Sequence, residues 1–156
     1  MKTEQPADNQ ECKLNGCIFF SVEKLSRVLG KIAEEAFVKT GLSPSHAILL
    51  YVVNIRGGIQ QKEIGELLHL TPSTITRLVE KLKRKGYLDK QSEGKNAYLQ
   101  TTSEGLAQQD EITASWNHLQ DRYKNILSEE EADQFIGSCC KLLESLGDEK
   151  NSSKTF

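Results

Sequence analysis

A hydroxyl residue followed by proline occurs twice in this chain, and each pair stands just before an apolar run with helical spacing. The pairs are Ser43-Pro44 and Thr71-Pro72. The side-chain oxygen of such a residue caps the free amides at a helix start, and proline is favoured at the first helical position. We therefore expect helices to begin at Pro44 and Pro72, with a short helix at 61–68 between them.

The short helix and the helix from Pro72 have the spacing of a helix-turn-helix. Gly65 is a small residue that allows close approach, although glycine costs about 1 kcal/mol relative to alanine inside a helix. His69 stands in the turn, where glycine is usual, and histidine adopts left-handed backbone more readily than most residues. Gly86 ends the second helix. The apolar positions expected to face the shared core are Ile64, Leu68, Leu70, Ile75 and Leu78.

Two strand candidates, 87–91 and 97–101, follow directly and are joined by the turn-forming residues 92–96. This pattern predicts a small β-hairpin with Lys95 and Asn96 at its tip. A hairpin after a helix-turn-helix is typical of a winged helix-turn-helix lobe, here expected over residues 42–102.

Apolar stripes with helical periodicity flank this lobe, at 14–40 and 103–147. Ser128 and Glu131 form a capping box for the last helix. The stripes carry more apolar surface than the lobe can obviously cover, which favours dimerisation helices but also permits packing within one chain. We expect a mainly α fold with a small β-hairpin wing. A single domain would span 14–147, with a flexible N-terminus at 1–13 and a flexible tail at 148–156.

Charge is distributed unevenly along the chain. Residues 60–97 have a balance of +3, whereas the whole chain has a net charge of −2. A basic segment between acidic flanks indicates a polyanion-binding face, although an ordinary solvated helix face gives the same pattern. The polar and basic side chains of the second helix suit a major-groove reader, and those of the hairpin suit the minor groove and phosphates. The candidate DNA-binding residues are Ser73, Thr74, Thr76, Arg77, Lys81, Lys90, Lys95 and Asn96.

The stretch QQKEIGELLHLTPSTITRLVEKLKRKGYLDKQSEGKNAYLQTTSEG resembles the core of the MarR family (multiple antibiotic resistance regulators). TPSTITRLVEKLKRKGYL and the following LQTTSEG are its most specific pieces, and the order of helices extends the resemblance over roughly 14–147. The chain departs from the family in the wing, where Glu93-Gly94-Lys95 stands in place of the usual Asp-x-Arg.

The resemblance implies a homodimer that binds a palindromic operator in double-stranded DNA as an effector-released repressor. It also implies a small-molecule pocket beside the dimer helices, for which His46, Tyr51, Arg56 and Trp116 are the candidates. Members of the family that sense peroxide have a reactive cysteine near the start of the first helix, and Cys17 is close to that place. No cofactor or metal site is expected, because the histidines are scattered.

Two other functions deserve comparison with DNA binding. An enzyme is not expected, because the chain has no phosphate loop, zinc-hydrolase motif or nucleophile elbow. A helical protein–protein interaction module that has lost DNA binding is the stronger rival, although the basic groups of the second helix and wing remain. The absence of a long apolar run or a signal-like N-terminus predicts a cytoplasmic location.

Overall fold

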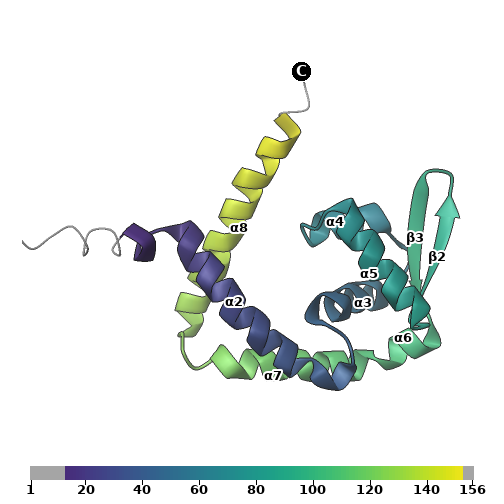
Figure 1. Ribbon diagram of the computed structural model, residues 1–156, viewed down its shortest axis with the longest axis horizontal. Helices are drawn as coiled ribbons and strands as arrows, with labels where there is room; N and C mark the ends of the chain where they lie inside the picture. Colours follow the sequence, from purple (N-terminus) through teal and green to yellow (C-terminus); the bar gives the residue numbers. More distant parts are fainter. Residues whose placement is uncertain (1–12, 153–156) are drawn as a thin grey trace, which may run out of the picture. The chain divides into compact units, whose positions relative to one another are not determined.

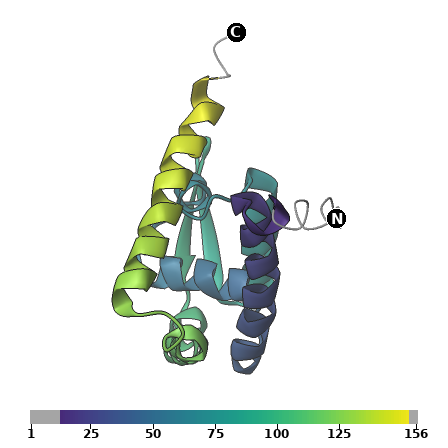
Figure 2. The same ribbon diagram turned by 90° about the vertical axis from the view of Figure 1, so that its left-hand side faces the viewer.

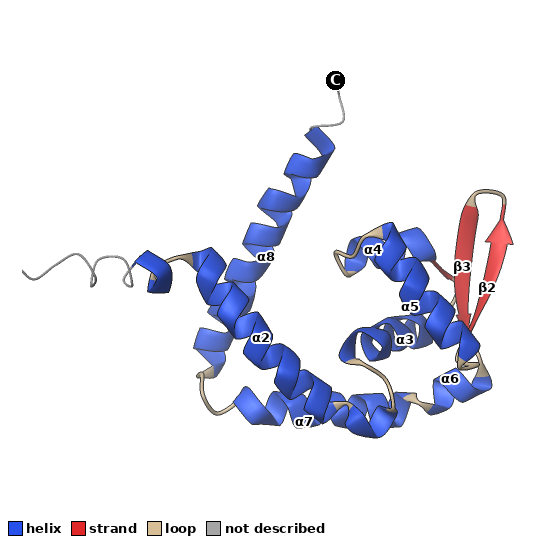
Figure 3. Ribbon diagram, in the orientation of Figure 1, coloured by secondary structure: helices blue, strands red, loops and turns tan. Residues whose placement is uncertain are grey.

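The computed structural model of this protein describes residues 13–152, with side chains described over 13–147. The chain divides into two compact units, one ending at Leu119 and one beginning at Gln120. Helices dominate both, and the strands belong to the first (Figures 1 and 3). The elements are α2 (Ile18–Ala36), η1 (Val38–Thr40), α3 (Pro44–Ile55), β1 (Ile59–Gln60), α4 (Gln61–Leu67), α5 (Pro72–Arg84), β2 (Leu88–Glu93), β3 (Asn96–Thr101), α6 (Ser103–Ala107), α7 (Gln109–Tyr123) and α8 (Glu129–Ser152).

The helix starts predicted from capping residues are confirmed. Ser43 accepts a hydrogen bond from the His46 amide at the start of α3. Thr71 does the same for the Thr74 amide at the start of α5. Before α8, the Ser128 amide donates to the Glu131 carboxylate, and the Glu131 amide donates to the Ser128 hydroxyl. This pair of bonds is the expected capping box.

The core lies where α3, α4 and α5 meet the sheet. Leu49, Leu50 and Val53 of α3 are fully buried, and Leu99 of β3 is buried with them. In α5 the buried positions recur at helical spacing, which leaves the other side of that helix free. The α5 residues that are buried are Ile75, Leu78, Val79 and Leu82.

The sheet has three antiparallel strands in the order β1-β3-β2, one more than the predicted hairpin. The additional strand β1 pairs Ile59 with Leu99, and its two residues are too few to show an alternating pattern in the sequence. The predicted five-residue loop is also wrong. Glu93 pairs with Asn96, so the turn is Gly94-Lys95, with Gly94 at a φ of +60°. Glycine at the first central position is what one class of two-residue hairpin turn requires.

The long flanking helices differ from the predicted ones at their ends. The stripe expected from Leu14 is interrupted at Gly16-Cys17, so α2 begins at Ile18. The helix expected from residue 103 is broken at Gln108 between α6 and α7. In contrast, α8 continues unbroken to Ser152, beyond the predicted start of the tail (Figure 2). Of the segments predicted to be flexible, 1–13 and 148–156, residues 1–12 and 153–156 lie outside the described residues.

Glycine and histidine backbones at the turns behave as the sequence predicted. Gly86, after α5, has a φ of +80°, and His69, in the turn between α4 and α5, has a φ of +51°. The fold class expected from the sequence, mainly α with a small β wing, is confirmed. No helix in the described part of the chain is both long and apolar enough to cross a membrane.

Candidate nucleic-acid interface

The outward side of α5 carries a row of polar and basic side chains. Ser73, Thr76, Arg77 and Lys81 are exposed, whereas Thr74 is half-buried. Because the apolar side of the same helix is packed into the core, this row cannot turn inward without unpacking the lobe. Figure 1 shows α5 between α4 and the hairpin, so helix and hairpin belong to one continuous part of the lobe.

Hydrogen bonds within the lobe already occupy some of these hydroxyls. The Thr74 and Thr71 oxygens lie 2.9 Å apart, within the N-terminal cap of α5. The Thr76 hydroxyl donates to the Pro72 carbonyl at 2.9 Å, and its oxygen accepts from Gln61 Nε2 at 3.1 Å. Ser73 has only a longer contact of 3.3 Å with the Thr71 oxygen. No hydrogen bond or ion pair of Arg77 or Lys81 occurs within the part of the chain that the structure describes, so these two cations are the freest donors of the row.

Gln61 is a member of this interface that the sequence analysis missed. It is the first residue of α4, and it is half-buried against Thr76 of the next helix. Its Oε1 atom is buried and has no hydrogen-bond partner among the described residues. Neither periodicity nor capping predicts a contact between two side chains fifteen positions apart.

Positive charge gathers beside α5, and its effect is visible at His46. The pKa of His46 is lowered from its ordinary value, first by burial and then by the charges of Lys81, Lys85 and Arg77. His46 Nδ1 also lies 2.5 Å from the Ser43 hydroxyl, which holds the ring at the start of α3. Two cations of α5 and Lys85, which follows that helix directly, therefore act on one point of the lobe. Such a concentration of charge is expected to attract polyanions.

The hairpin extends beyond α4 and α5 as a two-stranded arm (Figure 3). Lys95 and Asn96, at or beside its turn, are exposed. Lys90 is half-buried and pairs across the strands with the buried Leu99. Cross-strand partners lie on the same face of a sheet. Lys90 therefore starts from the core-facing side of the hairpin, unlike the two residues at the tip.

The residues predicted for an effector pocket do not form one group. Tyr51 and Trp116 stack, with ring centroids 6.1 Å apart and an interplanar angle of 25°. His46 instead lies near the α5 cations, and Arg56 forms an ion pair of 3.0 Å with Glu63. Of the four residues only Tyr51 and Trp116 are shown in contact with each other, so a pocket that all four line remains a prediction. Residues five apart on one helix are rotated by about 140°, so His46 and Tyr51 of α3 face different neighbours.

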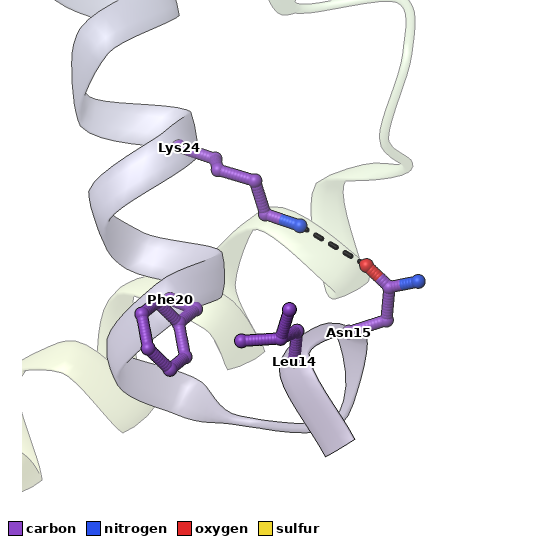
Figure 4. Close-up of a pocket in the computed structure, with 4 residues that line it drawn as sticks. All are labelled: Leu14, Asn15, Phe20 and Lys24. Carbon is purple, nitrogen blue, oxygen red and sulfur yellow. Dashed lines mark hydrogen bonds between the residues drawn. The ribbon is translucent and has the colours of Figure 1, made fainter. Parts of the chain in front are cut away.

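A hollow of about 330 Å³ lies instead near the start of α2, where Leu14, Asn15, Phe20 and Lys24 line it. Lys24 Nζ donates to Asn15 Oδ1 at 3.1 Å across its edge (Figure 4). This interaction neutralises none of the lysine's charge, and the hollow shares no residue with the predicted effector pocket.

The described cysteines and histidines form neither a disulfide nor a metal site. Cys17 is half-buried immediately before α2, and it provides no side-chain cap for that helix. It is free, as are Cys139 and Cys140, whereas Cys12 lies outside the described residues. Over the residues that could be searched, no three His, Cys, Asp or Glu side chains come together as a metal site.

Comparison with known sequences identifies a related family and a related repressor. The MarR family model matches residues 40–97, which include α3, α4, α5 and most of the hairpin. The HTH-type transcriptional repressor MdtR of Bacillus subtilis (strain 168) is 27% identical over 124 residues, covering 77% of this chain and 80% of that protein.

Solved structures share the fold at low sequence identity. The MepR–DNA complex of S. aureus has a TM-score of 0.74 at 20% identity, covering 83% of this chain and 98% of that chain. The PcaV transcriptional regulator of Streptomyces coelicolor, in complex with its natural ligand, has a TM-score of 0.77 at 21% identity, covering 94% and 99%. A MarR family regulator of Listeria monocytogenes, complexed with a 26mer DNA, has a TM-score of 0.74 at 21% identity, covering 85% and 91%. PcaV and the Listeria monocytogenes protein are described as transcriptional regulators, and the MepR and Listeria monocytogenes structures contain DNA.

Proposed function

We propose that the protein binds double-stranded DNA sequence-specifically and represses transcription. The match of residues 40–97 to the MarR family model supports this proposal. The observation that carries this proposal is the exposed polar and basic row on α5. In winged helix-turn-helix proteins, the helix that enters the major groove has its polar and basic side exposed to solvent beside the hairpin, and α5 has this arrangement.

In this proposal each residue of the row has a distinct role. Arg77 donates hydrogen bonds from both of its terminal nitrogens to guanine, which is the commonest specific contact in the major groove. Ser73 and Thr74, in the first turn of α5, approach bases or the phosphates beside them. Lys81 meets the phosphate backbone, and the other basic residues of α5 add to the same field.

The hairpin contacts the neighbouring minor groove through its tip. Lys95 carries the charge and Asn96 the hydrogen-bonding amide, while Glu93 stands where the family usually has an aspartate. Lysine contacts phosphates as a point charge and cannot make the forked contacts of arginine. We therefore expect this wing to strengthen binding without reading much sequence. Lys90 starts from the core-facing side of the hairpin. Its ammonium group would therefore reach a phosphate only when the side chain is fully extended.

The operator in this proposal is palindromic, because the protein acts as a homodimer. Large apolar side chains are exposed on α2, where Ile18 is 65% exposed, and on α8, where Ile136 is 59% exposed. Soluble proteins seldom leave such stripes open to water, and the occupant we propose is a second copy of this chain. A two-fold pair of α5 helices would read half-sites about 34 Å apart.

Release from DNA by a small molecule completes the proposed mechanism. The PcaV regulator was solved with its natural ligand, and CouR of Rhodococcus jostii RHA1 was solved with p-coumaroyl-CoA. In this chain Tyr51 and Trp116 provide an aromatic surface on which a flat ligand can stack. Oxidation of Cys17 is the second route to release that we propose. The protein would act in the cytoplasm, where it meets DNA.

The test is selection of bound sequences from random duplex DNA by the purified full-length protein. We expect enrichment of one palindromic sequence, and a binding constant for it that falls steeply as salt rises. Release of that duplex is then measured with added phenolic acids and with peroxide. Failure to enrich any sequence, with binding that is weak and independent of salt, would instead support a protein–protein interaction module.

A further inference from the structure

The hydrogen bonds around Thr76 determine which part of its side chain can meet DNA. Thr76 lies in the second turn of α5, exposed between the first-turn residues and Arg77. A threonine offers a base edge two different groups: a hydroxyl, which can donate and accept hydrogen bonds, and a methyl, which makes apolar contact. The two groups select different bases. Which of them is already hydrogen-bonded within the protein therefore decides which base Thr76 can recognise.

The hydroxyl of Thr76 uses its only hydrogen and one of its two lone pairs within the lobe. Its single hydrogen is donated to the Pro72 carbonyl at 2.9 Å, within its own helix. Its oxygen accepts from Gln61 Nε2 at 3.1 Å, and this amide comes from the neighbouring helix α4. A donation to DNA would require this hydrogen to turn away from Pro72 and give up that bond.

Gln61 resists any movement of the Thr76 oxygen itself. It is half-buried, and its Oε1 atom already lacks a partner among the described residues. If the Thr76 oxygen moved away, Gln61 Nε2 would lose its bond as well, and buried amide groups without partners are costly. The contact between α4 and α5 therefore holds the hydroxyl oxygen in place with its hydrogen already donated, and the methyl is the free apolar group of an exposed side chain.

We propose that Thr76 is a specificity-determining residue that recognises thymine through its methyl group. The thymine 5-methyl is the one apolar group on a base edge in the major groove, and threonine methyls contact it. Gln61 is the positioning residue that keeps the hydroxyl turned away. This inference rests on the proposed function, because it assumes that α5 enters the major groove.

The experiment replaces each thymine of the selected operator, one at a time, with deoxyuridine, which lacks only the 5-methyl. At one position in each half-site, wild-type affinity is expected to fall about fourfold, the value for one buried methyl or methylene group. The same scan is then repeated with Thr76→Val, which keeps the methyl, and with Thr76→Ser, which removes it.

Thr76→Val is expected to show the same sensitivity to deoxyuridine as the wild type, and Thr76→Ser is expected to bind both bases equally at that position. Thr113→Val and Thr113→Ser, at an exposed threonine of α7, are the matched controls and should not alter the scan. Melting temperatures confirm that each variant is folded.

The opposite pattern would overturn the inference: Thr76→Ser keeping the preference while Thr76→Val loses it shows recognition by the hydroxyl. A wild-type scan in which no thymine methyl matters overturns it too. If the wild type selects no operator at all, the proposed function itself fails, so the two failures are distinguishable.

Discussion

Gly105 lies at the beginning of α6, at a position where no side chain fits. A Cβ atom built there would overlap the carbonyl oxygen of Tyr87 and lie 2.8 Å from Thr101 Oγ1. The Gly105 carbonyl also accepts a bond of 3.2 Å from Asn54 Nδ2. Gly105 thus lies where the end of the hairpin, the start of α6 and helix α3 pack together.

Gly105→Ala is therefore expected to lower the free energy of unfolding by at least ~1–3 kcal/mol, the cost of overpacking. Urea denaturation measures this change. Gly30→Ala is the matched control, because nothing lies within 4 Å of a Cβ at Gly30 in the middle of α2. That control should be neutral, or stabilising by up to about 1 kcal/mol. Equal effects of the two substitutions would contradict the predicted steric role of Gly105.

His46 should make the stability of the lobe depend on pH. Burial and the nearby cations lower its pKa in the folded protein below the unfolded value of about 6.5. The unfolded state then binds the proton more tightly, so stability is complete above that value and falls as the pH drops through it. Melting temperatures between pH 8 and about pH 5 should therefore decline less for His46→Gln than for the wild type.

The control for this comparison is His118→Gln, on the exposed side of α7. It should follow the wild-type pH profile. If His46→Gln also follows the wild type, His46 does not carry the predicted linkage.

At the scale of elements, the hairpin tip is expected to bind without discriminating between sequences. Lys95→Ala should weaken binding to the selected operator and to unrelated duplexes by similar factors. It should also reduce the slope of log K against log salt by about 1, because one phosphate contact is lost. Fluorescence anisotropy over a salt series measures both quantities, with Lys39→Ala in η1 as control. A loss confined to the operator would show that the tip reads sequence.

Local chemistry in the sequence predicts most of the helix starts of this fold. Ser43, Thr71 and Ser128 fix the beginnings of three helices through bonds within four residues, so the sequence signals them directly. The left-handed backbone at His69 and Gly86 is predicted in the same way. The outward face of α5 follows from its periodicity, which places Ile75 and Leu82 inward.

Elements that depend on distant contacts were not predicted. β1 exists because Ile59 and Gln60 pair with β3, almost forty residues later in the chain. The break at Gln108 lies beside Asn54, whose amide bonds both Gly105 and Gln109 from α3. The Gln61–Thr76 contact is of the same kind. Such contacts are decided by packing, and a single sequence contains no local signal for them.

At the scale of the whole molecule, the match of residues 40–97 confirms the MarR resemblance inferred from the TPSTITRLVEKLKRKGYL segment. The homodimer remains a prediction, and it rests on the exposed apolar stripes. It has a direct consequence: a protein that unfolds from a dimer has a melting temperature that rises with concentration.

Ile136→Glu on α8 should therefore give a monomer by sedimentation and abolish operator binding, because a charge would be buried between the subunits. Ser138→Glu, also exposed on α8 but on another side of the helix, is the matched control and should remain dimeric. A wild-type protein that sediments as a monomer and still binds a palindrome tightly would contradict the proposed assembly.

The central claim, that the exposed row of α5 reads DNA, is tested most directly at Arg77. Affinities of the wild type, Arg77→Ala and the control Arg27→Ala are measured at one salt concentration, on the selected operator and on a scrambled duplex. Arg27 is exposed on α2 and forms an ion pair of 2.8 Å with Glu23. Arg77→Ala should cost ~1–3 kcal/mol on the operator and much less on the scrambled duplex, so that the preference collapses. An unchanged ratio of the two affinities would show that α5 does not read the sequence.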